Sequence, residues 1–249
     1  MQNSSVEVYV SPPNPSPAGS IEIKHGEKMA NLITIIIGVG LVGVVALLVY
    51  VLAIRPWYLR WGATDAEVER AMPGDDIIKN SMHVRNRAVT NAVTIKARPT
   101  HIWPWLVQMG NGRGGMYTYD WIDRLMGVLD QDSTWEVLPQ HQHLEVGEVI
   151  PLGGGPGWPV QAIEPNRSLV LDIPAPGTQI IWSYGLYELD ESHTRLVLRI
   201  TYSTSLNRLL MTLLLHIVDP GSFLMTRKHL LGIKQRAEAL AEQRTEQTE

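Results

Sequence analysis

The stretch TRLVLRITYST (Thr194–Thr204) decides the fold class, because its apolar side chains recur at every second residue. Successive side chains of a β-strand point to opposite faces of the sheet. One face of this strand carries Leu196, Leu198, Ile200 and Tyr202, and the other carries Arg195, Val197, Arg199 and Thr201. One apolar and one mixed face predict a half-buried strand of an antiparallel sheet.

Upstream of this strand, further segments with a period of two are separated by the turn sequences GGGPG, EPNR, PAPG and DESH. They predict strands over residues 148–152, 158–164, 168–173 and 179–189. An earlier strand is expected over residues 88–97. Two helices follow it, in THIWPWLVQM with Pro99 in the first turn, and in YDWIDRLMGVL over residues 119–129.

The C-terminal region is expected to be helical. LNRLLMTLLLHIV (206–218) is too short an apolar run to cross a membrane. Asp219 and Pro220 then offer the cap and first position of a new helix. Its apolar stripe includes Phe223, Leu230 and Ala237, and the sheet is the surface available to cover it. The sequence thus predicts an α+β domain, with a curved antiparallel sheet around a long C-terminal helix.

Residues 32–54, LITIIIGVGLVGVVALLVYVLAI, contain no charge. As a helix they would be about 34 Å long, enough for a hydrocarbon core of about 30 Å. Trp57, Tyr58 and Arg60 follow, as at a membrane interface. The alternative, a buried core helix, does not fit uninterrupted apolarity on every face. We expect one N-terminal transmembrane helix.

The boundaries expected are a disordered Pro-rich tail (1–30), the transmembrane helix (31–55), a structured collar (56–80), the folded domain (81–241) and a polar tail (242–249). In the collar, Thr64 and Glu67 form a capping-box pattern. Two lysines precede the apolar segment and three arginines follow it closely. This difference favours a single-pass protein of the inner or plasma membrane, with its C-terminal domain in the cytoplasm.

Composition excludes several classes of partner and site. The net charge is −4 with no clustered basic stripe, which argues against nucleic acid. The chain contains no cysteine, so it has no disulfide and no thiolate nucleophile. We expect no cofactor. The glycine runs at 110–115 and 153–159 lack the strand–loop–helix context and the lysine of phosphate-binding loops, and they are interpreted as turns.

Six motifs resemble those of one family over residues 61 to 238. They are WGATDAEVERAMPGDD, TIKARPTHIWPWLVQMGNGRGGMYTYDWIDRL, LEVGEVIPL, EPNRSLVL, TRLVLR and FLMTRKHLLGIKQRAE. The family is the START-related superfamily, also labelled SRPBCC or polyketide cyclase-like, and more narrowly a bacterial branch of it. The resemblance implies a helix-grip fold with a deep cavity for an apolar or lipid-like ligand. It implies no activity, since the superfamily includes carriers, sensors, cyclases and hydratases. Many relatives lack the membrane helix.

Polar residues offer few candidates for chemistry. His141 and His143, with two glutamates nearby, form an H-x-H pattern that could bind a metal, but no third ligand is placed and we predict no metal site. Tyr119 and Asp120 are the catalytic candidates, because a tyrosine and a carboxylate at a cavity mouth can move a proton. The alternative is that Asp120 or Thr118 caps the helix. Asp123 would then form a surface ion pair with Arg124 or Arg113.

Aromatic residues are the candidate ligand-binding side chains. They could line the cavity or fill the core, which in this fold are the same surface. They are Trp103, Tyr117, Tyr119, Trp121, Trp182 and Tyr184. Three hypotheses follow. The first is a membrane-anchored domain that carries or senses an apolar small molecule or lipid. The second is a metal-independent cyclase or hydratase-like enzyme, and the third is a ligand-free membrane scaffold or adaptor.

Overall fold

The computed structural model describes residues 9–11, 18–78, 84–205 and 207–246. Its helices are α1 (Ala18–Val49), the π-helical turn η1 (Tyr50–Ile54), α2 (Arg55–Leu59), α3 (Asp65–Glu69), α4 (Pro99–Val107), α5 (Asp120–Leu125), the 3₁₀ turn η2 (Pro139–His141) and α6 (Arg208–Glu246). Its strands are β1 (Val84–Ile95), β2 (Val149–Ile150), β3 (Trp158–Glu164), β4 (Ser168–Ala175), β5 (Thr178–Glu188) and β6 (Thr194–Thr204). The chain divides into two compact units between Ile54 and Arg55.

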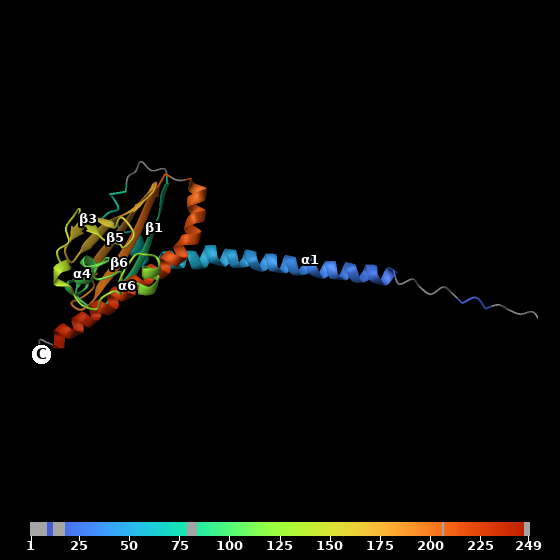
Figure 1. Cartoon of the computed structure of the whole chain (residues 1–249), viewed down its shortest axis with the longest axis horizontal. Helices are drawn as coiled ribbons and strands as arrows, with labels where there is room; N and C mark the ends of the chain where they lie inside the picture. Colours follow the sequence, from blue (N-terminus) through green and yellow to red (C-terminus); the bar gives the residue numbers. More distant parts are fainter. Residues whose placement is uncertain (1–8, 12–17, 79–83, 206, 247–249) are drawn as a thin grey trace, which may run out of the picture. The chain divides into compact units, whose positions relative to one another are not determined.

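The second unit is built on one antiparallel sheet with the strand order β1-β6-β5-β4-β3-β2 (Figure 1). β5 and β6 are paired along their whole length, from Thr178 opposite Thr204 to Glu188 opposite Thr194. β1, the first strand in the sequence, pairs with β6, the last strand in the sequence. The chain therefore returns to its starting edge before α6 begins, which leaves α6 free to cross the concave face.

The second half of α6 packs in the core. Leu230, Ile233 and Ala237 have no exposed surface, and they join the cluster that contains Leu196 and Leu198 of β6. A long helix held by a curved antiparallel sheet is the helix-grip arrangement, so the α+β fold expected from the sequence is confirmed. The strand positions are confirmed too, with β3 and β6 at the expected bounds.

The outer face of β6 differs from the expectation. We predicted a half-buried strand, but Val197, Arg199 and Thr201 are buried as well. The Arg199 guanidinium donates hydrogen bonds to the carbonyl oxygens of Arg70, Glu67 and Val68 and to the Asp75 carboxylate. Because these bonds hold the segment around α3 against the sheet, the outer face is covered by chain rather than by water.

α6 also differs from the expectation. It begins at Arg208 and continues through Pro220, where we expected one segment to end and a new helix to start. A proline inside a helix removes one backbone hydrogen bond and bends the axis. Figure 1 shows α6 changing direction between its orange and red parts. The two expected segments are therefore one bent helix.

Shorter local predictions agree more closely. The capping box at Thr64 and Glu67 is present at the start of α3. Pro99 occupies the first turn of α4, which also contains Pro104. α5 ends at Leu125, earlier than the expected Leu129, and Gly127 follows with a φ of 68°. A positive φ suits glycine and does not continue a right-handed helix.

The first unit is dominated by the apolar helix α1. It begins at Ala18, inside the region expected to be a tail. Residues 1–8 and 12–17 of that tail, and residues 247–249 of the polar C-terminus, lie outside the described residues. Among the described residues, two helices are long and apolar enough to cross a bilayer, Glu27–Leu59 and Leu209–Arg244. The most apolar window of the first has no buried residue, whereas the second belongs to α6, whose later half is core.

Candidate ligand-binding cavity

The cavity consists of two adjoining compartments between the sheet, α5 and α6. The sheet compartment has a volume of about 440 Å³ and lies between the strands and the first half of α6. The helix compartment has about 700 Å³ and lies between α5 and α6. They share the lining residues Trp158, Trp182, Val218, Ser222 and Thr226. Each volume falls within the range of small-molecule sites, about 300 to 1,000 Å³.

Two tryptophans stand between the compartments. The rings of Trp158 on β3 and Trp182 on β5 lie 5.0 Å apart between centroids. β3 and β5 are both neighbours of β4 in the sheet, and both indoles contribute to both linings. The period of two that places their side chains on the concave face therefore also positions this shared wall.

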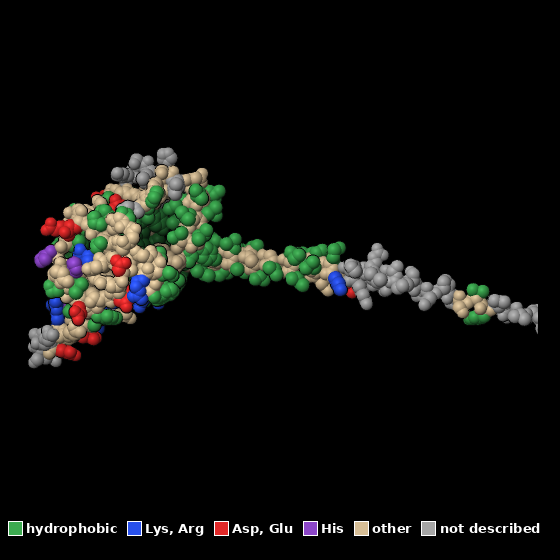
Figure 2. Space-filling view, in the orientation of Figure 1, with side chains coloured by type: hydrophobic (Ala, Val, Ile, Leu, Met, Phe, Trp, Pro, Cys, Tyr) green, Lys and Arg blue, Asp and Glu red, His purple; other side chains and the backbone are tan. Residues whose placement is uncertain are grey.

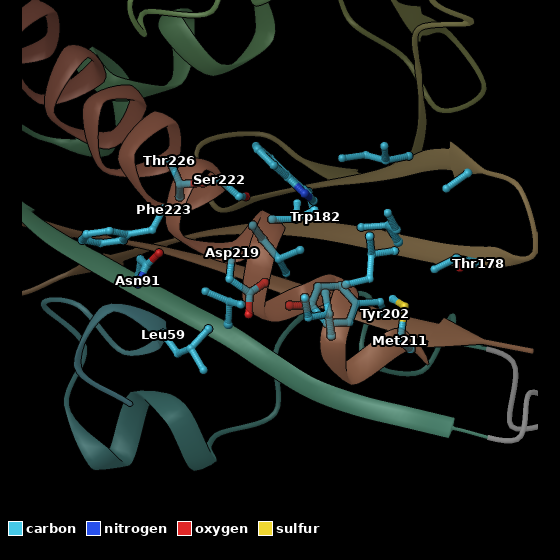
Figure 3. A pocket seen from close by; sticks show the side chains of 18 of the residues that line it. Leu59, Asn91, Thr178, Trp182, Tyr202, Met211, Asp219, Ser222, Phe223 and Thr226 are labelled. Atoms are coloured by element: carbon cyan, nitrogen blue, oxygen red, sulfur yellow. The ribbon is translucent and has the colours of Figure 1, made fainter. Parts of the chain in front are cut away.

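The sheet compartment is lined mainly by apolar side chains. Figure 3 shows its wall built from Asn91 on β1, Trp182 on β5 and Phe223 on α6. Phe223 stacks on Tyr58 of α2, with ring centroids 5.5 Å apart and an angle of 27° between the rings. α2 therefore closes the side of this compartment that the strands leave open.

Asn91 gives the sheet compartment one unpaired polar atom. The side chain is 1% exposed, and its Nδ2 donates a hydrogen bond of 3.0 Å to the Tyr58 carbonyl oxygen. Since a carbonyl only accepts, this bond fixes the orientation of the amide. The Oδ1 atom is buried and has no partner among the described residues. An unpaired buried acceptor costs about 1 to 3 kcal/mol, which a hydrogen-bond donor on a ligand would recover.

Asp219, which lines the same compartment, belongs to a largely buried ion pair. Arg55 Nη2 of α2 lies 2.6 Å from Asp219 Oδ2 of α6. Burial raises the pKa of Asp219, although the Arg55 charge and hydrogen bond lower it. Burial also raises the pKa of Tyr202, and Asp219 adds to this effect. Figure 3 shows Tyr202 and Asp219 pointing toward one another.

The helix compartment has a different polar group, the Asp123 carboxyl of α5. Asp123 is 3% exposed and accepts a hydrogen bond from Thr118 Oγ1. Burial raises its pKa, the Thr118 bond lowers it, and the neighbouring Asp120 raises it. The expected surface ion pair of Asp123 is therefore absent among the described residues; Arg124 instead pairs with Asp132. A buried carboxyl with a raised pKa is a potential proton donor.

His229 of α6 lies at the base of the helix compartment and is fully paired. Its Nδ1 lies 2.6 Å from the Met116 carbonyl oxygen and its Nε2 lies 3.0 Å from the Tyr184 hydroxyl. The carbonyl only accepts, so Nδ1 carries the proton and Nε2 accepts from Tyr184. Burial lowers the pKa of His229 to about 4, against the Met116 hydrogen bond, which raises it. The imidazole is neutral at pH 7.

The residues proposed from the sequence are divided between cavity and core. Trp182 lines both compartments, and Tyr119 and Trp121 line the helix compartment. Trp103, Tyr117 and Tyr184 line neither. Trp103 and Tyr117 belong to the hydrophobic core.

Asp120 has a structural partner. Ser133 Oγ donates it a hydrogen bond of 2.6 Å and in turn accepts one from the Tyr117 backbone N–H. The Asp120 side chain does not cap α5. Tyr119 occupies the N-cap position of that helix, and its side chain makes no capping hydrogen bond.

Several cavity residues could not be identified from the sequence patterns. Trp158, Asn91, Asp219 and His229 have no local pattern that separates them from ordinary strand and helix residues. One signal was present in the sequence of β1. Asn91 is a polar residue at a position where the alternation of the strand predicts an inward, apolar side chain. No group of three histidine, aspartate or glutamate side chains that could hold a metal ion occurs among the described residues.

Comparisons with known proteins give matches in structure only. No family model and no curated protein matches the chain. Norcoclaurine synthase from Thalictrum flavum, solved with dopamine and hydroxybenzaldehyde, aligns at a TM-score of 0.38 and 11% identity, over 64% of this chain and 88% of that one. CalU16 from Micromonospora echinospora aligns at 0.31 and 15%, over 64% and 92%. The Aha1 dimer from Colwellia psychrerythraea aligns at 0.32 and 20%, over 60% and 98%.

Proposed function

We propose that this protein binds an apolar small molecule or a lipid in the two compartments and is held at a membrane by α1. It acts as a carrier or a sensor. The observation that carries the proposal is the cavity itself, an apolar space between the sheet and α6 with a few polar groups at defined places. This is the usual composition of a site for a lipophilic ligand.

The polar groups restrict the chemistry of the ligand. Asn91 Oδ1 offers an acceptor without a partner, while the Asp219 carboxylate is already neutralised by Arg55. No side chain in the sheet compartment presents an unpaired positive charge among the described residues. A ligand with an apolar body and a neutral donor, such as a hydroxyl group, therefore fits better than a fatty-acid anion.

Anchoring supports the same proposal. The exposed apolar side chains of α1 have no protein to cover them among the described residues, and a bilayer is the solvent that suits such a helix. We propose a single pass of the inner or plasma membrane through residues 32–54, with the domain in the cytoplasm. A reporter fused to the C-terminus that is active only outside the inner membrane would contradict this orientation.

The binding proposal is tested on the full-length protein by extraction and mass spectrometry of co-purified lipids. Val218 lines both compartments and is half exposed, so Val218→Trp places an indole in the shared space. Ile217→Trp is the matched control, because Ile217 is adjacent to Val218 in the sequence but lines neither compartment. We expect a bound lipophile in the wild type and the control and its loss from Val218→Trp. Absence of any lipophile from all three proteins would count against the proposal.

A metal-independent cyclase or hydratase-like enzyme is the second candidate. It is favoured by one observation, that Tyr119, Asp123 and His229 line the same apolar compartment. Of these, Asp123 has the raised pKa that suits an acid. Asp123→Asn should then abolish conversion of the co-purified compound without preventing its binding. The third candidate, a scaffold with a filled core, is disfavoured by the cavity volumes.

A further inference from the structure

The first half of α6 exposes a continuous apolar stripe. Leu209, Leu213 and Ile217 recur at four-residue spacing and are 69%, 57% and 78% exposed. Leu224 continues the stripe after Pro220 and is 56% exposed. The opposite side of the same helix faces the sheet compartment, with Met211 and other apolar side chains. A helix on the surface of a soluble domain normally exposes polar residues on its outer side.

A second group of exposed apolar side chains belongs to α5 and the residue after it. Trp121, Leu125 and Met126 are 63%, 80% and 68% exposed. Trp121 and Met126 line the helix compartment together with Leu224 of α6, so the two groups border the same opening. Figure 2 shows a hollow in the domain with hydrophobic side chains around it. We call these two groups together the apolar rim.

The apolar rim on α6 has no unpaired charge among the described residues. Between residues 209 and 226 the titratable side chains are His216 and Asp219. His216 Nδ1 bonds to the Thr212 carbonyl oxygen, and Asp219 is 6% exposed and paired with Arg55. Arg227 and Lys228 follow directly, and neither pairs with a carboxylate in the part of the chain that the structure describes. An uncharged surface bordered by cations suits lipid tails and their phosphates.

The chain connects this rim closely to the anchor. Arg55 directly follows Ile54, the last residue of the apolar segment, and Arg55 bonds to Asp219 within the folded unit. Asp219 lies on α6 between Ile217 and Leu224. If residues 32–54 span a bilayer, Arg55 is the first residue outside the hydrocarbon core. Its ion pair with Asp219 then links the end of the membrane segment to the part of α6 that carries the rim.

We infer that the apolar rim inserts into the leaflet next to the anchor, and that the ligand enters the helix compartment from that leaflet between α5 and α6. This inference rests on the proposed membrane anchor. The occupant of the rim is a phospholipid leaflet rather than a second copy of the chain, because the rim borders the cavity mouth and a leaflet supplies lipophilic ligands there.

The test uses the absence of cysteine, which allows single-cysteine variants of the full-length chain to be labelled without background. Leu213→Cys and Leu125→Cys report on the rim. Leu189→Cys is the matched control, a leucine 59% exposed in the β5–β6 turn, at the opposite end of that strand pair from the start of α6, where the rim lies. Gly40→Cys reports on the anchor. Each variant carries a nitrobenzoxadiazole label in phosphatidylcholine vesicles with or without doxyl-labelled lipid.

We expect doxyl lipid to quench the label at positions 213, 125 and 40, and not at 189. Quenching at 40 alone would overturn the inserted rim and leave the anchor standing. Quenching at none of the four positions would overturn both. A label at 213 that is shielded from water but not quenched by the lipid would mean that protein covers the rim, which also overturns the inference.

Entry of the ligand from the leaflet is tested separately, by the rate at which the protein takes up a probe from vesicles. Ile217 lines neither compartment, so Ile217→Asp should leave the binding of a pyrene-labelled fatty alcohol delivered from cyclodextrin unchanged. Loading of the same probe from phosphatidylcholine vesicles should slow by about tenfold, because a charge must enter the interface. Leu189→Asp should change neither the binding of the probe from cyclodextrin nor the rate of its loading from vesicles. Equal loading of Ile217→Asp and wild type from vesicles would overturn entry through the rim.

Discussion

Arg55 of α2 and Asp219 of α6 form a buried ion pair of 2.6 Å, with side chains that are 16% and 7% exposed. Asp219 lines the sheet compartment, as do Tyr58 and Phe223 of the aromatic stack. The ion pair also joins the start of the folded unit to the middle of its longest helix, across 164 residues of chain. The pair is therefore one of the contacts, with the Tyr58–Phe223 stack, that hold the middle of α6 against α2.

Removal of one partner should be costly. Asp219→Asn leaves the Arg55 charge buried without a counter-charge, which typically costs about 3 kcal/mol. We expect a clear drop in the denaturant midpoint of the full-length protein in detergent. Glu164→Gln breaks the exposed Arg167–Glu164 pair instead and should leave the denaturant midpoint nearly unchanged, because water screens an exposed pair. Equal effects of the two substitutions would contradict a structural role for the buried pair.

The Asn91 amide should discriminate between ligands by one hydrogen bond. Dodecanol and its methyl ether share the same chain, but only the alcohol can donate to Asn91 Oδ1. We expect the wild type to prefer the alcohol by about fivefold, and Asn91→Leu to lose this preference. Competition against a fluorescent hydrocarbon measures both affinities. The measured quantity is the ratio of the two affinities, so a general loss of stability in the variant affects both affinities and cancels. An equal ratio in wild type and Asn91→Leu would show that Asn91 Oδ1 does not accept a hydrogen bond from the ligand.

His229 should make the stability depend on pH. Its folded pKa of about 4 is below the ordinary histidine pKa of 6.5, so the unfolded chain binds this proton first as the pH falls. Stability should be complete above about pH 6.5 and decline toward pH 4, by about 3 kcal/mol at about 1.4 kcal/mol per pKa unit.

His229→Asn retains a donor for the Met116 carbonyl and removes the titration. The difference between the unfolding free energies of wild type and variant, followed from pH 8 to pH 4, isolates this contribution from the carboxyl groups. A pH-independent difference would show that His229 is not held neutral by burial.

Two glycines of α6 should respond in opposite directions to alanine. A Cβ at Gly232 would lie 2.2 Å from the Tyr117 carbonyl oxygen, whereas a Cβ at Gly221 would meet nothing within 4 Å. Gly232→Ala should therefore destabilise the domain by about 2 kcal/mol. Gly221→Ala should stabilise it by up to about 1 kcal/mol through helix propensity. Denaturant unfolding measures both, and destabilisation of equal size at the two positions would contradict the close packing of α6 on Tyr117.

Much of the fold could be predicted because its signals are local. The period of two located β3 and β6 to the residue, and the apolar segment located the core of α1. The aromatic pattern also pointed to Trp182, Tyr119 and Trp121, which the folded chain brings to the cavity. Such patterns work because strands and helices impose fixed spacings on whichever side chains face the core.

The burial of Arg199 could not be predicted in the same way. Along β6 it looks like a solvent-facing residue, and only the segment around α3, more than a hundred positions earlier, converts its face into an interior. The same limit applies to Asp219 and Pro220, which have the local chemistry of a helix start. In the folded chain Asp219 pairs with Arg55 of α2, later residues of α6 pack on the sheet, and the helix continues through both positions.

The order of the strands and helices, the α+β class and an apolar N-terminal segment long enough for a bilayer can be predicted from local patterns, since each depends on neighbours along the chain. The folded chain is needed to show that Asn91 lines the cavity with an oxygen that has no partner among the described residues, that His229 pairs with Tyr184, and that Trp103 and Tyr117 pack in the core. These properties depend on burial and on partners distant in sequence. Hydrogen bonding and desolvation act across space, and the pattern of one strand or helix does not encode them.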